Sequence, residues 1–174
     1  MDKIIIAEKK VLIIDPTGEY KDSFPEPAVK KLNLGIDTTI SPGKLSMQQW
    51  SMLFETNSNT QSAVLAEAIH SLRYQEKKGK SSCLIKAGQG IAYLQKELAT
   101  VSKNDVNFNV SLLPEQIAAE SVSEPNKGSD YIYDTFKANA NSYLVQKVTY
   151  QLGNTSFLTF FKNDPNLFNL LEEI

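Results

Sequence analysis

The longest uninterrupted run of aliphatic residues in this chain is only four residues long, from Val11 to Ile14. A helix that crosses a bilayer needs about 20 consecutive apolar residues, so the sequence predicts no membrane span. Asp15 and Pro16 end the run at once. A short apolar run that stops at turn residues is typical of a strand buried on both faces. The sequence therefore predicts a buried strand over residues 11–15.

Helical periodicity dominates the rest of the chain. Apolar residues recur every three or four positions over residues 60–77, 90–101 and 138–152. This spacing places them on one face of an α-helix, so we expect the three longest helices there.

Local signals add shorter elements. Ser46 with Gln49 three positions later forms a capping-box pattern, and Pro114 suits the first turn of another helix. Alternating apolar and polar residues predict a second strand over 106–112. A last helix is expected from Asp164 onward. The elements together predict an α+β fold that is predominantly helical with a few short strands.

Composition bounds the classes of function. The 174 residues suit one domain, and 18 basic against 20 acidic residues give a net charge of -2. That balance provides no strong positive field that would make the whole surface a nucleic-acid binder. One cysteine and one histidine exclude a disulfide framework and a metal site rich in either residue. The first ten residues reach charge too early for a signal peptide, which predicts a cytoplasmic location.

The strongest candidate site is the turn after the first predicted strand, Asp15-Pro16-Thr17-Gly18-Glu19-Tyr20. A buried strand would deliver the carboxylates of Asp15 and Glu19 to its C-terminal end, where ligands bind in open α/β sheets. Carboxylates in that position can hold Mg²⁺ through water or orient an attacking water. The alternative is a structural turn of the Asx type, with Glu19 in solvent.

The densest basic cluster is a second candidate. It consists of Arg73, Lys77, Lys78 and Lys80, which lie at and after the end of a predicted helix. Basic residues near an aromatic side chain can grip a phosphate backbone, so these four are candidate DNA contacts. A solvated helix end explains them as well, because helix C-termini favour cations.

The sequence contains no complete phosphate-loop motif. Gly79-Lys80-Ser81 resembles the end of such a loop, but the required glycine five residues before the Gly-Lys pair is Tyr74. No run of four aliphatic residues followed by Asp-Glu, the Walker B pattern, follows downstream.

The turn at Asp15–Tyr20 resembles the Asp-Pro-His-Gly-Glu-Tyr signature of HerA-like ATPases, which are hexameric DNA translocases and helicases of the FtsK–HerA branch. Thr17 stands where that family usually has histidine. In the family the signature ends the strand that follows the phosphate-loop helix, and a helical region is inserted before the Walker B strand. The resemblance implies that residues 1–20 are the end of that helix, the core strand and its turn. Residues 21–174 would be the inserted helical subdomain, excised from a P-loop ATPase.

The resemblance also implies a function. The chain would be the central fragment of an ATP-driven translocase or helicase on double-stranded DNA, with ATP and Mg²⁺ as cofactors of a homo-hexameric parent protein. Asp15 and Glu19 would be catalytic in the intact ATPase, with Thr17 and Gly18 close to the nucleotide. The fragment alone, without a phosphate loop and a Walker B strand, is expected to be inactive, to bind no cofactor or metal, and to be a monomer or weak dimer.

A second hypothesis is a self-contained, non-enzymatic interaction module that binds a protein partner through its apolar helix faces. The reading frame upstream of Met1 discriminates between the two. A phosphate-loop motif in frame there would favour the ATPase fragment.

Overall fold

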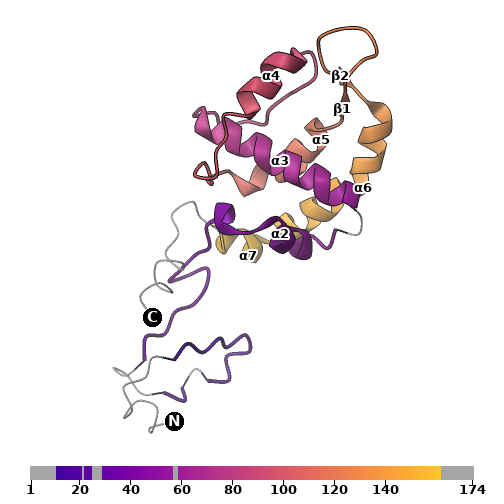
Figure 1. Ribbon diagram of the computed structural model, residues 1–174. Helices are drawn as coiled ribbons and strands as arrows, with labels where there is room; N and C mark the ends of the chain where they lie inside the picture. The colour runs from indigo at the N-terminus through magenta and orange to yellow at the C-terminus, as the bar shows by residue number, and fades with distance from the viewer. Residues whose placement is uncertain (1–10, 21, 25–28, 57–58, 162–174) are drawn as a thin grey trace.

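The computed structural model describes residues 11–20, 22–24, 29–56 and 59–161. These residues form an α+β fold that is mostly helical, as predicted. Figure 1 shows a body of packed helices from which the N-terminal segment extends away. The first ten residues, where the resemblance implies the end of a helix, and the last helix expected from Asp164 lie outside the described residues. Within the described part of the chain, no helix has the length and apolar character needed to cross a membrane.

Two 19-residue helices form most of the body and confirm the strongest periodicity predictions. They are α3 (Asn59–Lys77) and α6 (Thr135–Gly153). The helix expected over 90–101 is confirmed as the shorter α4 (Ile91–Leu98). The remaining helical elements are the 3₁₀ turns η1 (Pro42–Lys44) and η2 (Val110–Leu112), and the short helices α2 (Met47–Leu53), α5 (Leu113–Ala119) and α7 (Thr155–Thr159).

Side-chain caps fix where these helices begin. The Ser46 hydroxyl accepts a hydrogen bond from the Gln49 amide at 3.2 Å, and the Gln49 side chain accepts one from the Ser46 amide at 2.8 Å. The predicted capping box is therefore confirmed. α6 begins three residues earlier than predicted, because the Asp134 carboxylate caps it by accepting from the Lys137 amide at 3.0 Å.

The core lies where α5 packs against both α3 and α6. The apolar stripes predicted for α3 and α6 point into it. Trp50 of α2 closes one side and stacks on Phe54, with ring centroids 5.6 Å apart. The main buried cluster consists of Trp50, Phe54, Leu65, Ala68, Ile69, Leu72, Cys83, Phe108, Val110, Leu113, Ile117, Leu144, Val148 and Leu152.

The strand predicted over 106–112 is wrong, although its alternation is real. Phe108 and Val110 are buried and Asn109 between them is exposed, as the pattern required. The Asn109 side chain, however, accepts from the Ser111 amide at 3.0 Å and starts the 3₁₀ turn η2. The alternation reports burial against helices, since no described segment pairs with this one as a strand.

The buried strand predicted over 11–15 is also wrong for this structure. Residues 11–14 have no assigned strand, and their side chains are 45–80% exposed. A strand satisfies its backbone groups only by pairing with a neighbour. Among the described residues no neighbour pairs with this segment, so it runs through solvent with its apolar side chains uncovered.

A small hairpin was missed by the sequence patterns. Strands β1 (Val122–Ser123) and β2 (Ile132–Tyr133) pair antiparallel and flank the polar loop between them. Two residues per strand are too few to produce a readable alternation. The hairpin leads directly into α6 and lies at its N-terminal end in Figure 1.

The segment around Leu84 is held by two glutamines instead of by strands. The Gln116 side chain of α5 accepts from the Leu84 amide at 2.7 Å and donates to the Leu84 carbonyl at 3.1 Å. The side-chain amide of Gln75, on α3, donates to the carbonyls of Ser82 and Cys83 at 2.9 and 3.0 Å. The two side chains thus supply the hydrogen bonds that neighbouring strands would give.

Candidate functional site

The turn at residues 15–20 is organised around one carboxylate. Asp15 Oδ1 accepts hydrogen bonds from the amides of Gly18 at 2.9 Å and Glu19 at 3.2 Å. Its other oxygen accepts from the Tyr20 amide at 2.9 Å, and the Thr17 hydroxyl lies 3.4 Å from Oδ1. Gly18 has φ +76°, a left-handed conformation that favours glycine over residues with a side chain.

These bonds decide what each carboxylate can do. The Tyr20 amide above all, with those of Gly18 and Glu19, holds the pKa of Asp15 below its usual value. The Asp15 carboxylate is therefore occupied in shaping the turn. Glu19 is exposed to solvent. The sequence left open a structural Asx-type turn with Glu19 in solvent, and the geometry has that form.

The same geometry tests whether the turn suits a nucleotide with Mg²⁺. Three backbone amides that could have faced a phosphate donate to Asp15 instead, Gly18 among them. The turn therefore offers no amide cradle. The exposed Glu19 carboxylate and the Thr17 hydroxyl are oxygen donors, which suit a hydrated Mg²⁺ or a water. These oxygen donors suit the binding of Mg²⁺ or water, and they do not suit the binding of phosphate.

Arg73 of the basic cluster is largely committed to the fold. Its guanidinium donates to the Gly43 carbonyl at 3.2 Å and lies over the Phe108 ring, 5.9 Å from the centroid. Partial burial lowers its pKa. Gly43 itself sits against the Val106 carbonyl, where a Cβ would come within 1.9 Å, so Arg73 secures a backbone crossing that admits no side chain.

The three lysines of the cluster differ in their partners. Lys77 bonds Asp105 at 2.9 Å and the Thr100 carbonyl at 2.5 Å. Lys78 pairs with Glu97 at 2.9 Å. Within the described residues, Lys80 is the lysine of the cluster with no acidic partner. The cluster therefore resembles the solvated helix end that the sequence allowed, while DNA contact by these residues stays a prediction.

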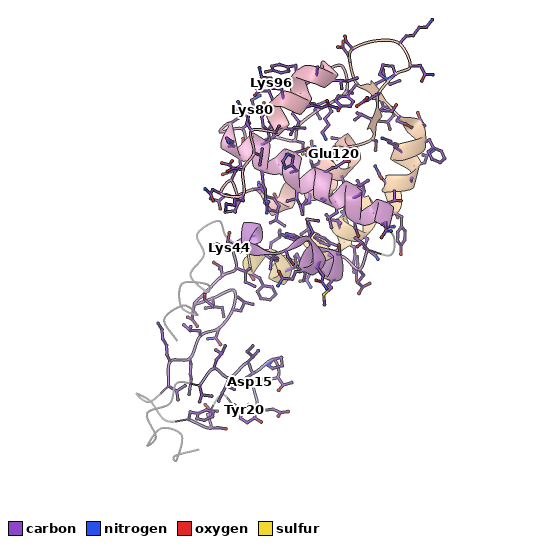
Figure 2. The ribbon with its side chains drawn as sticks, viewed as in Figure 1. Asp15, Tyr20, Lys44, Lys80, Lys96 and Glu120 are labelled. Atoms are coloured by element: carbon purple, nitrogen blue, oxygen red, sulfur yellow. The ribbon has the colours of Figure 1, made fainter. Side chains whose placement is uncertain are left out.

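The two candidate sites lie far from each other. Figure 2 shows Asp15 and Tyr20 in the segment that extends from the body, and Lys80 in the part of the helical body far from that segment. The structure therefore does not combine the acidic turn and the basic cluster into one site.

A buried ion pair escaped the sequence reading altogether. Lys86 pairs with Glu120 at the end of α5, and their side chains are 9% and 0% exposed. The other Glu120 oxygen accepts from the Ser71 hydroxyl at 2.6 Å and from the side-chain amide of Gln116 at 2.8 Å. These residues belong to separate segments with no shared motif, so only the fold could show that they meet.

The pair forms part of the wall of a cavity of about 600 Å³. Two further polar residues of its wall also have partners. His70 lies 3.1 Å from the Leu98 carbonyl, and Lys137 donates to the Val122 carbonyl at 2.8 Å. Among the described residues, no group of three histidine, cysteine or acidic side chains could hold a metal ion. Within the described residues the cavity therefore has no assignable metal site.

Asp105 should make the stability of the basic helix end depend on pH. The Ser102 amide, Lys77 and the Ser102 hydroxyl lower its pKa from 3.8 to about 2. A depressed folded-state pKa stabilises fully above 3.8, and the contribution is lost as the pH falls towards 2. We expect Asp105→Asn to lower the urea midpoint at pH 7, with the deficit shrinking below pH 3.8.

Glu76→Gln is the matched control for this change, because Glu76 is an exposed acid on the same helix end as Lys77. Glu76→Gln should leave the urea midpoint nearly unchanged at pH 7 and at pH 3. A deficit of Asp105→Asn that stays constant down to pH 3 would contradict the assignment.

Comparison with known proteins gives one match. The family model described as the central domain of the helicase HerA (DUF87) matches residues 2–151. No curated protein and no solved structure matches the chain.

Proposed function

Because the chain belongs to the family of the HerA helicase central domain, we propose that it is the central part of an ATP-driven translocase or helicase on double-stranded DNA. The observation that carries the proposal is the extent of the family match, which includes both the acidic turn and most of the helical body. The family makes the chain an ATPase-related protein. Translocation, the DNA substrate, a cytoplasmic location and a homo-hexameric parent are the proposed parts.

The exposed apolar run supports a place inside a larger ATPase. Residues 11–14 present four aliphatic side chains to solvent and no described segment covers them. In the larger protein this run pairs with core strands, which buries its side chains and satisfies its backbone. Residues 1–20 then belong to the ATPase core, and residues 21–174 form the helical insertion.

We assign different tasks to the residues of the turn. Asp15 holds the backbone of residues 18–20 in place through its hydrogen bonds. That turn presents the Glu19 carboxylate, which orients the attacking water or a water bound to Mg²⁺. The Thr17 hydroxyl, which lies 3.4 Å from Asp15 Oδ1, would be close to the nucleotide, and Gly18 permits the left-handed bend. ATP with Mg²⁺ supplies the phosphoryl group and the charge that neutralises it.

This chain alone should bind ATP with Mg²⁺ negligibly, with a dissociation constant in the millimolar range or weaker. Most nucleotide affinity in such folds comes from an amide cradle and its lysine, and the sequence contains no such motif. The amides of the acidic turn are also occupied by Asp15. Isothermal titration calorimetry of the chain measures this directly, and micromolar binding would reveal a nucleotide site elsewhere in it.

Phosphate release by the natural protein that contains this chain tests the function. We expect ATP hydrolysis that double-stranded DNA accelerates. A natural protein that hydrolyses no ATP under any DNA condition would overturn the proposal. That result would favour the non-enzymatic interaction module, for which the exposed helix faces are the binding surface.

A further inference from the structure

Helix α6 carries a row of exposed aromatic side chains that the packing of the body does not use. Phe136, Tyr143 and Tyr150 are 83%, 56% and 85% exposed. The opposite face of the same helix contributes Leu144 and Val148 to the core. Single exposed apolar residues are common, but an ordered row of large ones marks an interaction surface.

The spacing of the row is that of a helix-pairing seam. Its members lie seven residues apart, and each step of seven residues returns to the same face of an α-helix within about 20°. The row therefore runs along one side of α6. Figure 1 shows α6 along an edge of the helical body, where a second molecule can approach it.

We propose that this row docks against the α6 row of a second copy of the chain, antiparallel, about a two-fold axis at Tyr143. The row is symmetric about that residue, with Phe136 and Tyr150 each seven positions away. A two-fold axis there places Phe136 of each copy against Tyr150 of the other and Tyr143 against its own counterpart. Such an isologous contact requires a self-complementary surface, which this symmetric row provides.

The lysines of α6 do not meet across this contact. The helix contains two lysines and no acidic residue from Thr135 to Gly153. In the antiparallel arrangement Lys147 lies level with Asn139 of the partner, and Lys137 with Thr149 of the partner, so the contact opposes no like charges along the seam. Lys147 is also held on its own copy, by the Glu55 carbonyl at 2.7 Å and above the Tyr143 ring at 5.5 Å.

The ends of the two α6 helices favour the antiparallel direction over the parallel one. Antiparallel helices place opposite ends of their dipoles together, whereas a parallel pair places like ends together. The β1–β2 hairpin precedes α6, and its Ile132 and Tyr133 are 49% and 63% exposed. In the antiparallel pair each hairpin lies beside the partner's C-terminal turn, instead of against the other hairpin.

The area available predicts a weak dimer. Aromatic side chains bury about 150–250 Å² each, so three partly exposed rings from each copy cover on the order of 900 Å². Specific stable interfaces bury about 1,200 Å² or more. We therefore expect association that rises with concentration rather than a permanent dimer. The inference does not depend on the ATPase assignment.

Sedimentation equilibrium of the full chain tests the association. The weight-average mass should rise from 19.4 kDa towards twice that value as concentration increases. Tyr143→Lys places two ammonium groups together at the axis and should keep the chain monomeric. Tyr93→Lys changes a comparably exposed tyrosine (63%) on α4 and should leave association intact. A chain that stays at 19.4 kDa at every concentration, or equal loss in both variants, would overturn the proposal.

Disulfide trapping tests the direction. The native Cys83 is buried and should not compete. Under mild oxidation Tyr143→Cys should form an intermolecular disulfide faster than Tyr93→Cys. A mixture of Phe136→Cys and Tyr150→Cys chains, made distinguishable in mass, should yield the mixed dimer in excess of either homodimer. Homodimers through position 136 would indicate a parallel pair and would contradict the antiparallel assignment.

Discussion

Replacing Glu19 by glutamine in the natural ATPase should lower the rate of ATP hydrolysis by roughly ten- to a thousandfold, while ATP binding survives. Glutamine keeps the size of the side chain and removes its charge. The Glu19 side chain is exposed and accepts none of the turn's hydrogen bonds, so the backbone of residues 15–20 should keep its shape. The loss therefore reports the carboxylate alone, as an orienting group for water or hydrated Mg²⁺.

Steady-state phosphate release and nucleotide binding are measured together on each variant. Asp22→Asn is the matched control, because it removes an exposed acidic charge two residues after the turn. Thr17→His installs the residue that the HerA family usually carries, and this change should be tolerated. Full activity of the Glu19→Gln enzyme would make the acidic turn a structural feature only.

Replacing Lys86 by methionine should destabilise the chain by about 3–5 kcal/mol, because it leaves the Glu120 carboxylate buried without its partner. Glu120 is fully buried and its Ser71 and Gln116 partners are neutral, so neither can compensate its charge. Urea denaturation followed by circular dichroism measures the free energy of unfolding.

Two further variants separate charge from packing. Adding Glu120→Gln to Lys86→Met removes the stranded charge and should recover a large part of the loss. Lys78→Met breaks the Lys78–Glu97 pair, whose side chains are 40% and 21% exposed, and should cost far less than Lys86→Met because solvent screens the pair. Equal costs for Lys86→Met and Lys78→Met would refute a structural role for the buried pair.

Helices could be predicted from the sequence wherever they bury one face. The stripe of α3 that includes Leu65, Ala68 and Leu72 points into the hydrophobic core of the body. The Ser46 cap could be predicted because its partner Gln49 is only three residues away. Strand predictions failed because a strand depends on a partner. Residues 11–14 look buried in composition, yet nothing in the described structure covers them. The apolar pattern indicates that the segment needs to be buried, but it does not identify the strands that bury it.

The candidate site shows the same division. The motif identified the acidic turn, and the sequence allowed both a catalytic and a structural interpretation of its two carboxylates. Only coordinates could show that Asp15 accepts the turn's amides while Glu19 is free of them. The ion pair of Lys86 and Glu120 lay outside any sequence inference, because 34 positions separate residues that no motif connects.

The glutamine clamps around Leu84 determine where this chain can accept a change in length. An extra residue in the turn at Gly79 would be absorbed there, because residues 76–82 are exposed to solvent. An extra residue between Leu84 and Lys86 would instead rotate the extended segment by one position relative to Gln116. Lys86 would then face solvent and Glu120 would lose its counter-charge. Natural insertions in relatives of this chain should therefore gather before Ser82 and be absent from residues 82–86.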